Sequence, residues 1–239
     1  METTITDFHC HVLPHMDDGS VSAEMSVAML EESARQGIRR MVATPHFYPH
    51  RDTLEGFLRR REASAEALRK AKEGISGLPT VYLGAEVYFC RGMSQWEDLP
   101  RLRTGYNLLV EMPLAPWKKE HYEELRALCR RPGVRPVIAH IERYITPWNR
   151  AGILRKLRHD GVGIQANAEF FLNKKTCRMA LDMLKKGQID YLGSDCHDTS
   201  ARKQNLAAAV ALIREKLGQE ALDRLIQMEE SVFDDEKDK

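Results

Sequence analysis

The chain has 239 residues with 36 basic and 35 acidic side chains, so its formal net charge at pH 7 is only +1. This length fits one domain, because α/β barrels reach about 250 residues without splitting, and the balanced charge gives no sign of a nucleic-acid or anionic-membrane partner. No apolar run approaches the roughly 20 residues that span a bilayer, and the N-terminus carries no signal segment, so we expect a cytoplasmic protein without membrane insertion.

Short runs rich in Val, Ile, Leu and Tyr predict seven strands, over residues 4–9, 39–44, 80–86, 107–111, 135–140, 162–167 and 190–194. Helical patterns are predicted between and after them, over 22–36, 53–72, 117–130, 148–159, 174–186, 202–217 and 220–228. The alternation implies a parallel sheet with helical crossovers. Seven such units favour a closed barrel over a doubly wound sheet. We expect one domain over 1–228 and a charged, frayed tail over 229–239.

Residues with metal-binding side chains follow the predicted strands. His9 and His11 are two apart on the first strand, so both address one face while Cys10 turns away. Alone, a His-x-His pair is more often a structural pair than a metal site. The ends of the other strands carry further His, Asp and Glu side chains, namely His46, Glu86, Glu111, His140, Asp195 and His197. In a parallel barrel these ends converge on one face, where active sites lie, so we expect one shared site.

This residue set indicates the kind of metal. His, Asp and Glu without thiolates suit borderline-hard divalent ions such as Mn, Fe or Zn, and carboxylates can bridge two ions, so we expect more than one metal. Asp18 by itself is typical of a turn followed by a helix cap. Arg143 and Arg202 follow His140 and His197 closely and could grip a phosphate, although spacing alone leaves these roles open in a chain with 36 Lys and Arg.

These motifs together resemble a known family. They are DFHCHVLP (7–14), DDG (17–19), ATPH (43–46), GAE (84–86), LVEMP (109–113), AHIERY (139–144) and GSDCH (193–197). The set resembles the polymerase-and-histidinol-phosphatase (PHP) superfamily, and within it the bacterial manganese-dependent tyrosine-protein phosphatases of capsule and exopolysaccharide biosynthesis, the CpsB type. The likeness runs from about residue 4 to about residue 217.

The resemblance implies a distorted, TIM-like (β/α)7 barrel with three divalent ions, Mn²⁺ first and Fe or Zn as alternatives. It assigns nine ligands: His9, His11, Asp195 and a bridging Glu86 to the first ion, Glu86, Glu111 and His140 to the second, and Asp18, His46 and His197 to the third. Arg143 and Arg202 match the arginines that grip the phosphate. The implied substrate is a phosphotyrosine protein, the tyrosine autokinase of polysaccharide export. The alternatives are a small-molecule phosphatase such as a histidinol-phosphate phosphatase, or a PHP phosphodiesterase.

Two segments depart from the family pattern. Ile141 replaces the proline of the usual His-Pro-Glu-Arg, which puts the local geometry beside His140 in question. The segment 47–51, FYPHR, is specific to this chain, and as the rim of a strand-to-helix loop it either selects the substrate or is an ordinary solvated loop.

A cysteine nucleophile is a competing mechanism. The five cysteines are scattered without a C-x-x-C pair, which argues against a disulfide framework and a zinc knuckle. Two Cys-x5-Arg matches occur, from Cys129 and from Cys196. The first is followed by Pro132, which removes a backbone donor, and the second lies between two expected metal ligands, so neither fits a phosphate-binding loop. We expect Cys10 and Cys196 to be buried packing thiols.

Overall fold

Parallel strands form the centre of the molecule. The computed structural model describes residues 5–233, except for the side chain of Ser231. The strands are β1 (Thr6–Cys10), β2 (Arg40–Ala43), β3 (His46–Phe47), β4 (Thr80–Leu83), β5 (Glu86–Tyr88), β6 (Asn107–Glu111), β7 (Arg135–Ile138), β8 (Gly163–Asn167) and β9 (Tyr191–Gly193). They are ordered β1-β2-β4 and β3-β5-β6-β7-β8-β9, and every pair is parallel.

Two of the seven predicted strands are interrupted. β2 and β3 are separated by Thr44 and Pro45, and β4 and β5 by Gly84 and Ala85. Proline has no backbone N–H, so it breaks the ladder locally. The pairing nevertheless continues through the gap, because the N–H of Gly84 donates to Ala43 O (2.9 Å) and that of Glu86 to Pro45 O (3.1 Å). The seven strand positions are therefore confirmed, with two of the strands bent.

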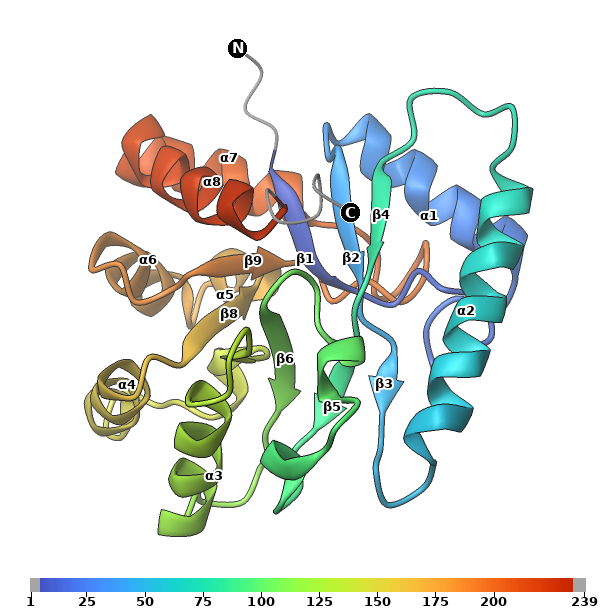
Figure 1. Cartoon of the computed structure of the whole chain (residues 1–239). Coiled ribbons are helices and arrows are strands. Elements are labelled where there is room, and N and C mark those ends of the chain that lie inside the picture. The colour runs from blue at the N-terminus through green and yellow to red at the C-terminus, as the bar shows by residue number, and fades with distance from the viewer. Residues whose placement is uncertain (1–4, 234–239) are drawn as a thin grey trace.

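The first and last strands close the barrel. The backbone N–H of Asp195 donates to His9 O, and that of His11 donates to Cys196 O, both at 2.8 Å. Cys10 and Cys196 form a parallel bridge between the two chain segments. Figure 1 shows β1 beside β9 with the helices around the outside. The expected single-domain, distorted TIM-like barrel is confirmed.

Helices surround the strands as the sequence predicts, with one addition. They are α1 (Ala23–Arg35), α2 (Leu54–Ala71), α3 (Lys119–Cys129), α4 (Arg150–His159), α5 (Ala168–Leu172), α6 (Cys177–Lys185), α7 (Leu206–Leu217) and α8 (Gln219–Phe233). The short α5 was not predicted. Short 3-10 turns, η1 (Met93–Gln95) and η2 (Leu99–Leu102), occupy the connection from β5 to β6, and η3 (Ile141–Arg143) follows β7. Among the described helices none is long and apolar enough to cross a membrane.

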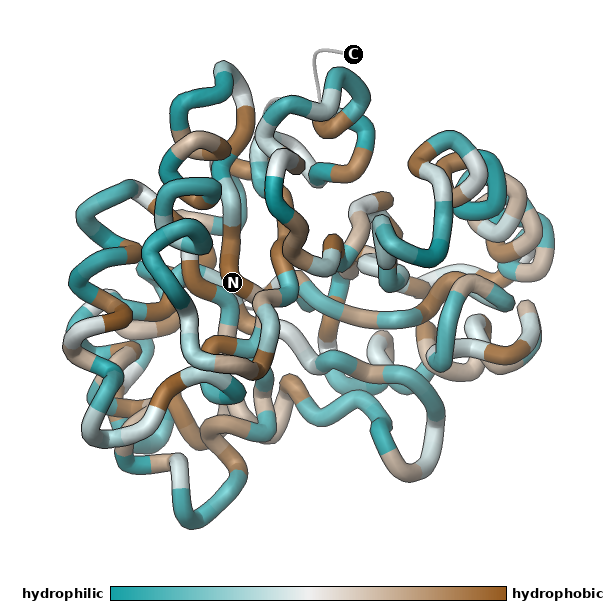
Figure 2. The backbone as a smooth tube through the Cα atoms, turned by 90° about the horizontal axis from the view of Figure 1, so that it is seen from below, coloured by the Kyte–Doolittle hydropathy of each residue, from teal (hydrophilic) through white to brown (hydrophobic). Residues whose placement is uncertain are grey.

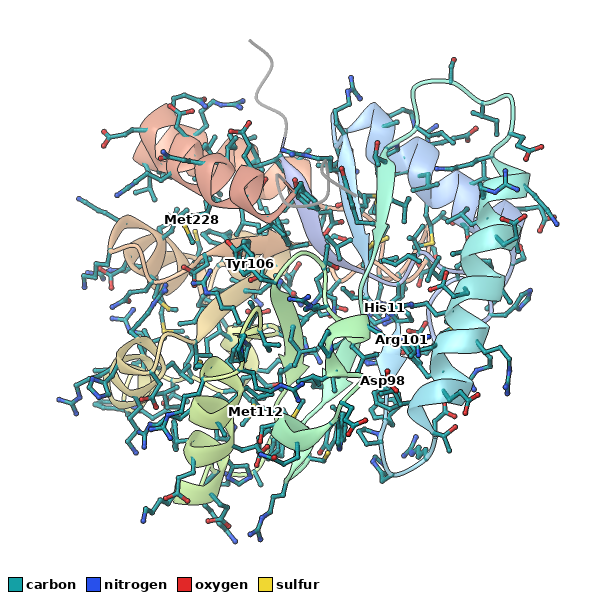
Figure 3. All side chains as sticks on the ribbon, viewed as in Figure 1. His11, Asp98, Arg101, Tyr106, Met112 and Met228 are labelled. Atoms are coloured by element: carbon teal, nitrogen blue, oxygen red, sulfur yellow. The ribbon has the colours of Figure 1, made fainter. Side chains whose placement is uncertain are left out.

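Apolar side chains pack on both faces of the strands. Figure 2 shows hydrophilic segments at the periphery, and Figure 3 shows side chains filling the space between strands and helices. The larger cluster joins the helices to the barrel, for example through Met29, Leu30 and Met41, all at most 1% exposed. A smaller cluster lies inside the barrel and includes Phe8 and Tyr191.

The end of α8 corrects one expectation. The predicted frayed tail over 229–239 is wrong for residues 229–233, which are helical. Val232 and Phe233 are buried against the inner cluster, with the rings of Phe8 and Phe233 5.7 Å apart, and the carboxylate of Glu229 accepts the N–H of Thr6 at 2.8 Å. Two apolar side chains among the charges are enough to anchor this turn. Residues 234–239 lie outside the described residues, and we propose that the single domain includes all of α8.

Candidate metal centre

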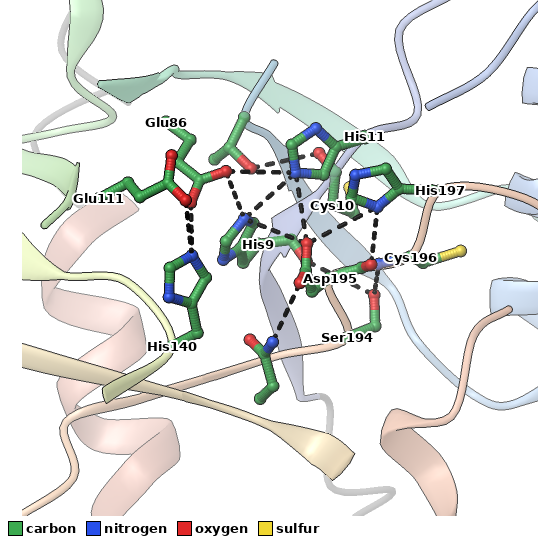
Figure 4. A network of polar contacts seen from close by, with 12 residues as sticks. His9, Cys10, His11, Glu86, Glu111, His140, Ser194, Asp195, Cys196 and His197 are labelled. Carbon is green, nitrogen blue, oxygen red and sulfur yellow. Dashed lines mark hydrogen bonds and ion pairs between the residues drawn. The ribbon is translucent and has the colours of Figure 1, made fainter. Parts of the chain in front are cut away.

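The nine side chains predicted as metal ligands lie together at the C-terminal end of the barrel. They are His9 and His11 at the end of β1, Asp18 in the loop after it, His46 and Glu86 at the first residues of β3 and β5, Glu111 at the end of β6, His140 after β7, and Asp195 and His197 after β9. Figure 4 shows His9, His11, Glu86 and Asp195 at the centre of this cluster. Positions up to 188 residues apart, from His9 to His197, thus become neighbours.

Donor atoms in the cluster converge on three overlapping groups. In each group every residue offers one donor atom, and these atoms all lie within 4.8 Å of one another. The groups are His9, His11 and Glu86; His11, Asp18, His46 and His197; and His46, Glu86 and Glu111. Nε2 of His9 lies 3.2 Å from both Nε2 of His11 and Oε2 of Glu86. Oδ1 of Asp195 is 3.5 Å and 3.4 Å from the same two nitrogens.

Each of these groups differs from an expected set in one member. The first lacks Asp195, the second contains His11 in addition to Asp18, His46 and His197, and the third contains His46 where His140 was expected. Nε2 of His140 still lies 2.7 Å from Oε1 of Glu86 and 3.9 Å from Oε1 of Glu111, so it borders the same carboxylates. Each of the nine residues therefore remains a candidate ligand.

Hydrogen bonds orient three imidazoles so that their Nε2 lone pairs point into the cluster. Nδ1 of His11 contacts the Asp17 carboxylate at 2.7 Å, Nδ1 of His9 contacts Gln165 Oε1 at 3.2 Å, and Nδ1 of His197 contacts the Asp195 carbonyl at 2.8 Å. These oxygens only accept hydrogen bonds, so each Nδ1 keeps the proton of the neutral imidazole, which leaves Nε2 as the ligand atom. Such partners on the far nitrogen are typical of metal-binding histidines.

The arrangement fits divalent metal ions. Nε2 of His9 and Nε2 of His11 face each other at 3.2 Å beside carboxylate oxygens, which is repulsive unless a positive charge, either a proton or a metal ion, lies between them. Nε2 of His197 is buried and has no hydrogen-bond partner among the described residues. Nitrogen and oxygen donors without a thiolate suit Mn, Fe or Zn.

Acidic side chains make the cluster strongly negative. Burial raises the pKa of Glu86, but His9 and the hydrogen bonds from the surrounding histidines outweigh it and hold this pKa well below its usual range. Burial also raises the pKa of Asp195, and the charges of His9 and His11 lower it far more. For Glu111, burial and the charge of Glu86 raise the pKa. Carboxylates packed this densely need compensating cations.

The two predicted phosphate-binding arginines flank Asp195 at the edge of the cluster. Nη2 of Arg143 lies 2.8 Å from Oδ2 of Asp195, and Nη2 of Arg202 lies 3.1 Å from Oδ1. Nη1 of Arg143 lies 3.6 Å from Oε1 of Glu111, and Nη1 of Arg202 lies 3.3 Å from Oδ2 of Asp18. Both side chains are about two-fifths exposed, so they can reach an anion from the cluster's open side.

An open cleft with two lobes leads to the cluster. The larger lobe has a volume of about 860 Å³ and includes Arg143, Asp195 and Arg202. The smaller lobe, of about 530 Å³, includes Arg51, and the two lobes share Asp18, His46 and Tyr48. Two residues of the segment 47–51, Tyr48 and Arg51, therefore line the cleft.

Sequence reasoning missed the residues that support the ligands. Asp17 has no role in the sequence analysis beyond the DDG motif, yet it accepts hydrogen bonds from His11, from the N–H of His46 (2.8 Å) and from the N–H of Gly19 (2.9 Å). Gln165 joins His9 to the N–H of His140 (2.6 Å). The sequence did contain a signal for Gln165, because Gln165 and Asn167 are polar residues two apart in a fully buried strand and therefore point to the same face.

Glycines make room for the two central histidines. A Cβ on Gly19 would collide with Cβ and the carbonyl oxygen of His11, and a Cβ on Gly193 would collide with Cβ of His9. Both glycines are thus required by close packing against ligands.

The backbone beside the ligands is unusual. His140 and Asp195 have φ values of 34° and 55°, a left-handed conformation that is costly for residues other than glycine and concentrates at functional sites. Ile141, which stands where the family has proline, is completely buried in the core. The β-branched side chain is therefore accommodated by packing.

The thiols are poorly placed for nucleophilic attack. Cys196 is 1% exposed, its Sγ lies 3.5 Å from Asp198 O, and Figure 4 shows it pointing away from the cluster. Burial raises its pKa well above the usual range. Cys10 is buried with Sγ 3.3 Å from Val42 O. Cys129 ends α3, and burial raises its pKa to about 11. These are inert packing thiols.

Known proteins resemble the chain over nearly its whole length. The family described as capsular polysaccharide synthesis, CpsB/CapC, matches residues 5–232. The tyrosine-protein phosphatase CpsB of Streptococcus pneumoniae is 30% identical over 229 residues, which cover 89% of this chain and 90% of that protein.

Solved structures also resemble the fold. The crystal structures of YwqE from Bacillus subtilis and CpsB from Streptococcus pneumoniae, described as unique metal-dependent tyrosine phosphatases, give a TM-score of 0.80 at 26% identity, covering 93% of this chain and 92% of the other. Histidinol phosphate phosphatase from Lactococcus lactis gives a TM-score of 0.60 at 16% identity, covering 91% and 94%, a likeness of fold alone.

Proposed function

The chain belongs to the CpsB/CapC family of capsular polysaccharide synthesis, and we propose that it is a metal-dependent protein-tyrosine phosphatase. The observation that carries this proposal is the pair of guanidinium groups flanking Asp195 at the mouth of a cluster of His, Asp and Glu donors. Guanidinium forks match phosphate oxygens, and such donors hold the ions that assist phosphate hydrolysis. The substrate that we propose is the tyrosine autokinase of polysaccharide export, which the role of the family in capsule synthesis supports.

We propose that the ligands hold three divalent ions, with Mn²⁺ as the first choice and Fe or Zn as alternatives that share the same donors. His9, His11, Asp195 and Glu86 would hold one, Glu86, Glu111 and His140 the second, and Asp18, His46 and His197 the third. Bound there, the ions would activate water and neutralise charge on the phosphoryl oxygens. Gln165 and Asp17 keep the imidazoles in the tautomer that this binding requires.

Arg143 and Arg202 would bind the phosphoryl group directly. In the structure Arg143 donates to one oxygen of Asp195 and Arg202 forms an ion pair with the other, and their partial exposure allows each to present its remaining N–H groups to a substrate in the larger lobe. Fixed positive groups placed where negative charge grows stabilise the transition state of phosphoryl transfer. No phosphoenzyme is needed, because both candidate cysteines are buried or remote from the cluster.

The shape of the cleft favours a protein substrate over a small one. Small-molecule pockets typically enclose most of the ligand in roughly 300–1,000 Å³. Here a lobe of about 860 Å³ continues past Asp18, His46 and Tyr48 into another of about 530 Å³. A phosphotyrosine on a peptide has space for its neighbours on both sides.

The test is hydrolysis of a phenyl phosphate by protein that has been stripped of metal and reloaded with Mn, Fe or Zn. Chelation should abolish turnover and reloading should restore it. His140→Ala should reduce kcat/KM by more than about 100-fold, because loss of even a residue supporting a ligand costs about 10- to 100-fold. His159→Ala, an exposed histidine at the end of α4, is the matched control and should be unaffected.

Near-normal turnover after chelation, or by the His140→Ala variant, would contradict the proposal. A panel of phosphotyrosine peptide, phosphoserine peptide and histidinol phosphate separates the proposed activity from its alternatives. Preference for histidinol phosphate would favour the small-molecule phosphatase instead.

A further inference from the structure

Tyr48 occupies a distinctive place in the cleft. It follows β3, two residues after the candidate ligand His46, and it lines both lobes. Only Asp18 and His46 share this double position among the lining residues of the two lobes, and both belong to the candidate metal centre. Tyr48 is therefore the aromatic side chain at the junction between the metal centre and the open cleft.

Neighbouring side chains hold the ring of Tyr48 in place. It is stacked with His46, with ring centroids 5.1 Å apart and an angle of 27° between the planes. The guanidinium carbon of Arg51 lies 5.2 Å from its centroid, and the ring of Tyr88 packs at 5.8 Å. The backbone turns tightly here, because the N–H groups of Arg51 and Asp52 both donate to Tyr48 O, at 2.9 Å and 3.1 Å. A ring that is already fixed loses little entropy when a substrate packs against it.

The same part of the cleft must receive the group that carries the phosphate. Arg143 and Arg202 line the larger lobe together with Tyr48, so a phosphoryl group held by the two guanidiniums has Tyr48 in the wall of the same lobe. In an aryl phosphate the aromatic ring is bonded directly to the phosphate's bridging oxygen. That ring therefore enters the lobe next to the phosphoryl group, where an aromatic wall can pack against its face or edge.

Arg51 appears in the structure as a support for this ring. Its guanidinium forms no ion pair within residues 5–233, and its contact is with the π-face of Tyr48. The neighbouring arginine of the smaller lobe, Arg60, is instead paired with the carboxylate of Asp52. A cation over a tyrosine ring contributes modestly at an exposed site, which suits a role in orienting the ring.

We propose that Tyr48 is the specificity-determining residue that selects aryl over alkyl phosphate monoesters, by packing against the aromatic ring of the substrate beside the phosphate. This inference rests on the proposed phosphatase function and adds to it the residue that recognises the leaving group. The ring of Tyr48 provides the selectivity, and its hydroxyl group is dispensable.

The experiment compares phenyl phosphate with an alkyl phosphate, propyl phosphate, on the metal-loaded protein. Tyr48→Ala should raise KM for phenyl phosphate and reduce the aryl-to-alkyl ratio of kcat/KM by about 3- to 10-fold, the range expected for one aromatic pair. Tyr48→Phe should keep the wild-type ratio. Tyr122→Ala, which removes a ring on α3 outside both lobes, is the matched control and should also keep it.

The other outcomes would refute either the role of Tyr48 or the proposed phosphatase function. An unchanged ratio in Tyr48→Ala, with wild-type protein active on both esters, refutes the role of Tyr48 and leaves the phosphatase function standing. An equal loss on both esters together with reduced metal content means that Tyr48 only supports His46, which also refutes the inference. If Tyr48→Ala fails to fold, Tyr48→Leu keeps the volume without the aromatic ring and should show the reduced ratio. Wild-type protein that hydrolyses no phenyl phosphate refutes the proposed function itself.

Discussion

Replacing Asp17 by Asn tests how far the metal centre depends on a residue that is not itself a ligand. Oδ2 of Asp17 accepts from Nδ1 of His11 at 2.7 Å and from the N–H of His46 at 2.8 Å, while Oδ1 accepts from the N–H of Gly19 at 2.9 Å. Burial raises the pKa of Asp17, but the hydrogen bond and charge of His11 outweigh it, so the carboxylate is ionised. Asparagine has one acceptor and one donor, so at least one of these N–H groups loses its partner.

The size of the effect follows from these contacts. Loss of a carboxylate behind a ligand histidine typically reduces metal affinity by about 10- to 100-fold. At about 1.4 kcal/mol per tenfold, this corresponds to about 1.4–2.8 kcal/mol. A single hydrogen bond to a charged group contributes about 1.5–3 kcal/mol, which gives the same range from the His11 contact alone.

The assay is a titration of metal-free protein with Mn²⁺ in competition with a chelator of known affinity, together with thermal unfolding of the metal-free state. Asp98→Asn is the control, because Asp98 is exposed beside η2 and pairs only loosely with Arg101, at 3.7 Å. Wild-type metal affinity in Asp17→Asn would refute the reasoning that Asp17 prepares His11 for metal binding. Weaker affinity with an unchanged metal-free melting temperature would support it.

Three further predictions concern separate parts of the molecule. Cys196→Ser should leave kcat/KM on phenyl phosphate unchanged, because the Cys196 thiol is buried and points away from the cluster. An inactive variant that still binds metal would instead support a cysteine nucleophile. Arg143→Lys should lower kcat/KM at least about tenfold, since an ammonium group cannot reproduce a guanidinium fork; an equally active variant in steady-state kinetics would argue against direct phosphate contact. Burial raises the pKa of Glu229 from 4.5 to about 8, so the folded state keeps a proton that the unfolded state releases. The stability contributed by this proton falls by about 1.4 kcal/mol per pH unit as pH rises from about 4.5 to about 8. In urea unfolding, the free energy of unfolding of Glu229→Gln should therefore rise relative to that of the wild type over this pH range. A constant difference between the two proteins across the range would contradict the buried proton.

The sequence alone located the barrel and its site because both depend on short-range patterns. Alternation of apolar runs with helical stretches indicated the seven strand positions, and each candidate ligand except Asp18 lies within a few residues of one of them. Parallel strands must then bring those ends to one face. The residues that define the cluster, such as Glu86 and His140, could therefore be placed together before any distance was known.

The supporting contacts could not be predicted in this way, because they join residues that have no fixed spacing in the chain. Asp7 accepts hydrogen bonds from Ser194, 187 residues away, and Gln165 joins β1 to the loop after β7. The buried end of α8 was missed for the same reason. Charged residues around Val232 and Phe233 dominate the local composition, while Phe8, which packs against Phe233, lies at the other end of the sequence.

Residue type and strand position thus determined which side chains could bind metal and phosphate. The tertiary structure decided how they work together: which nitrogen of each histidine faces the cluster, that Asp195 lies between Arg143 and Arg202, and that Tyr48 lies where two lobes meet. The physical reason is that ligand identity is a property of a residue, whereas tautomer, ion pairing and cleft shape are properties of its neighbours in space.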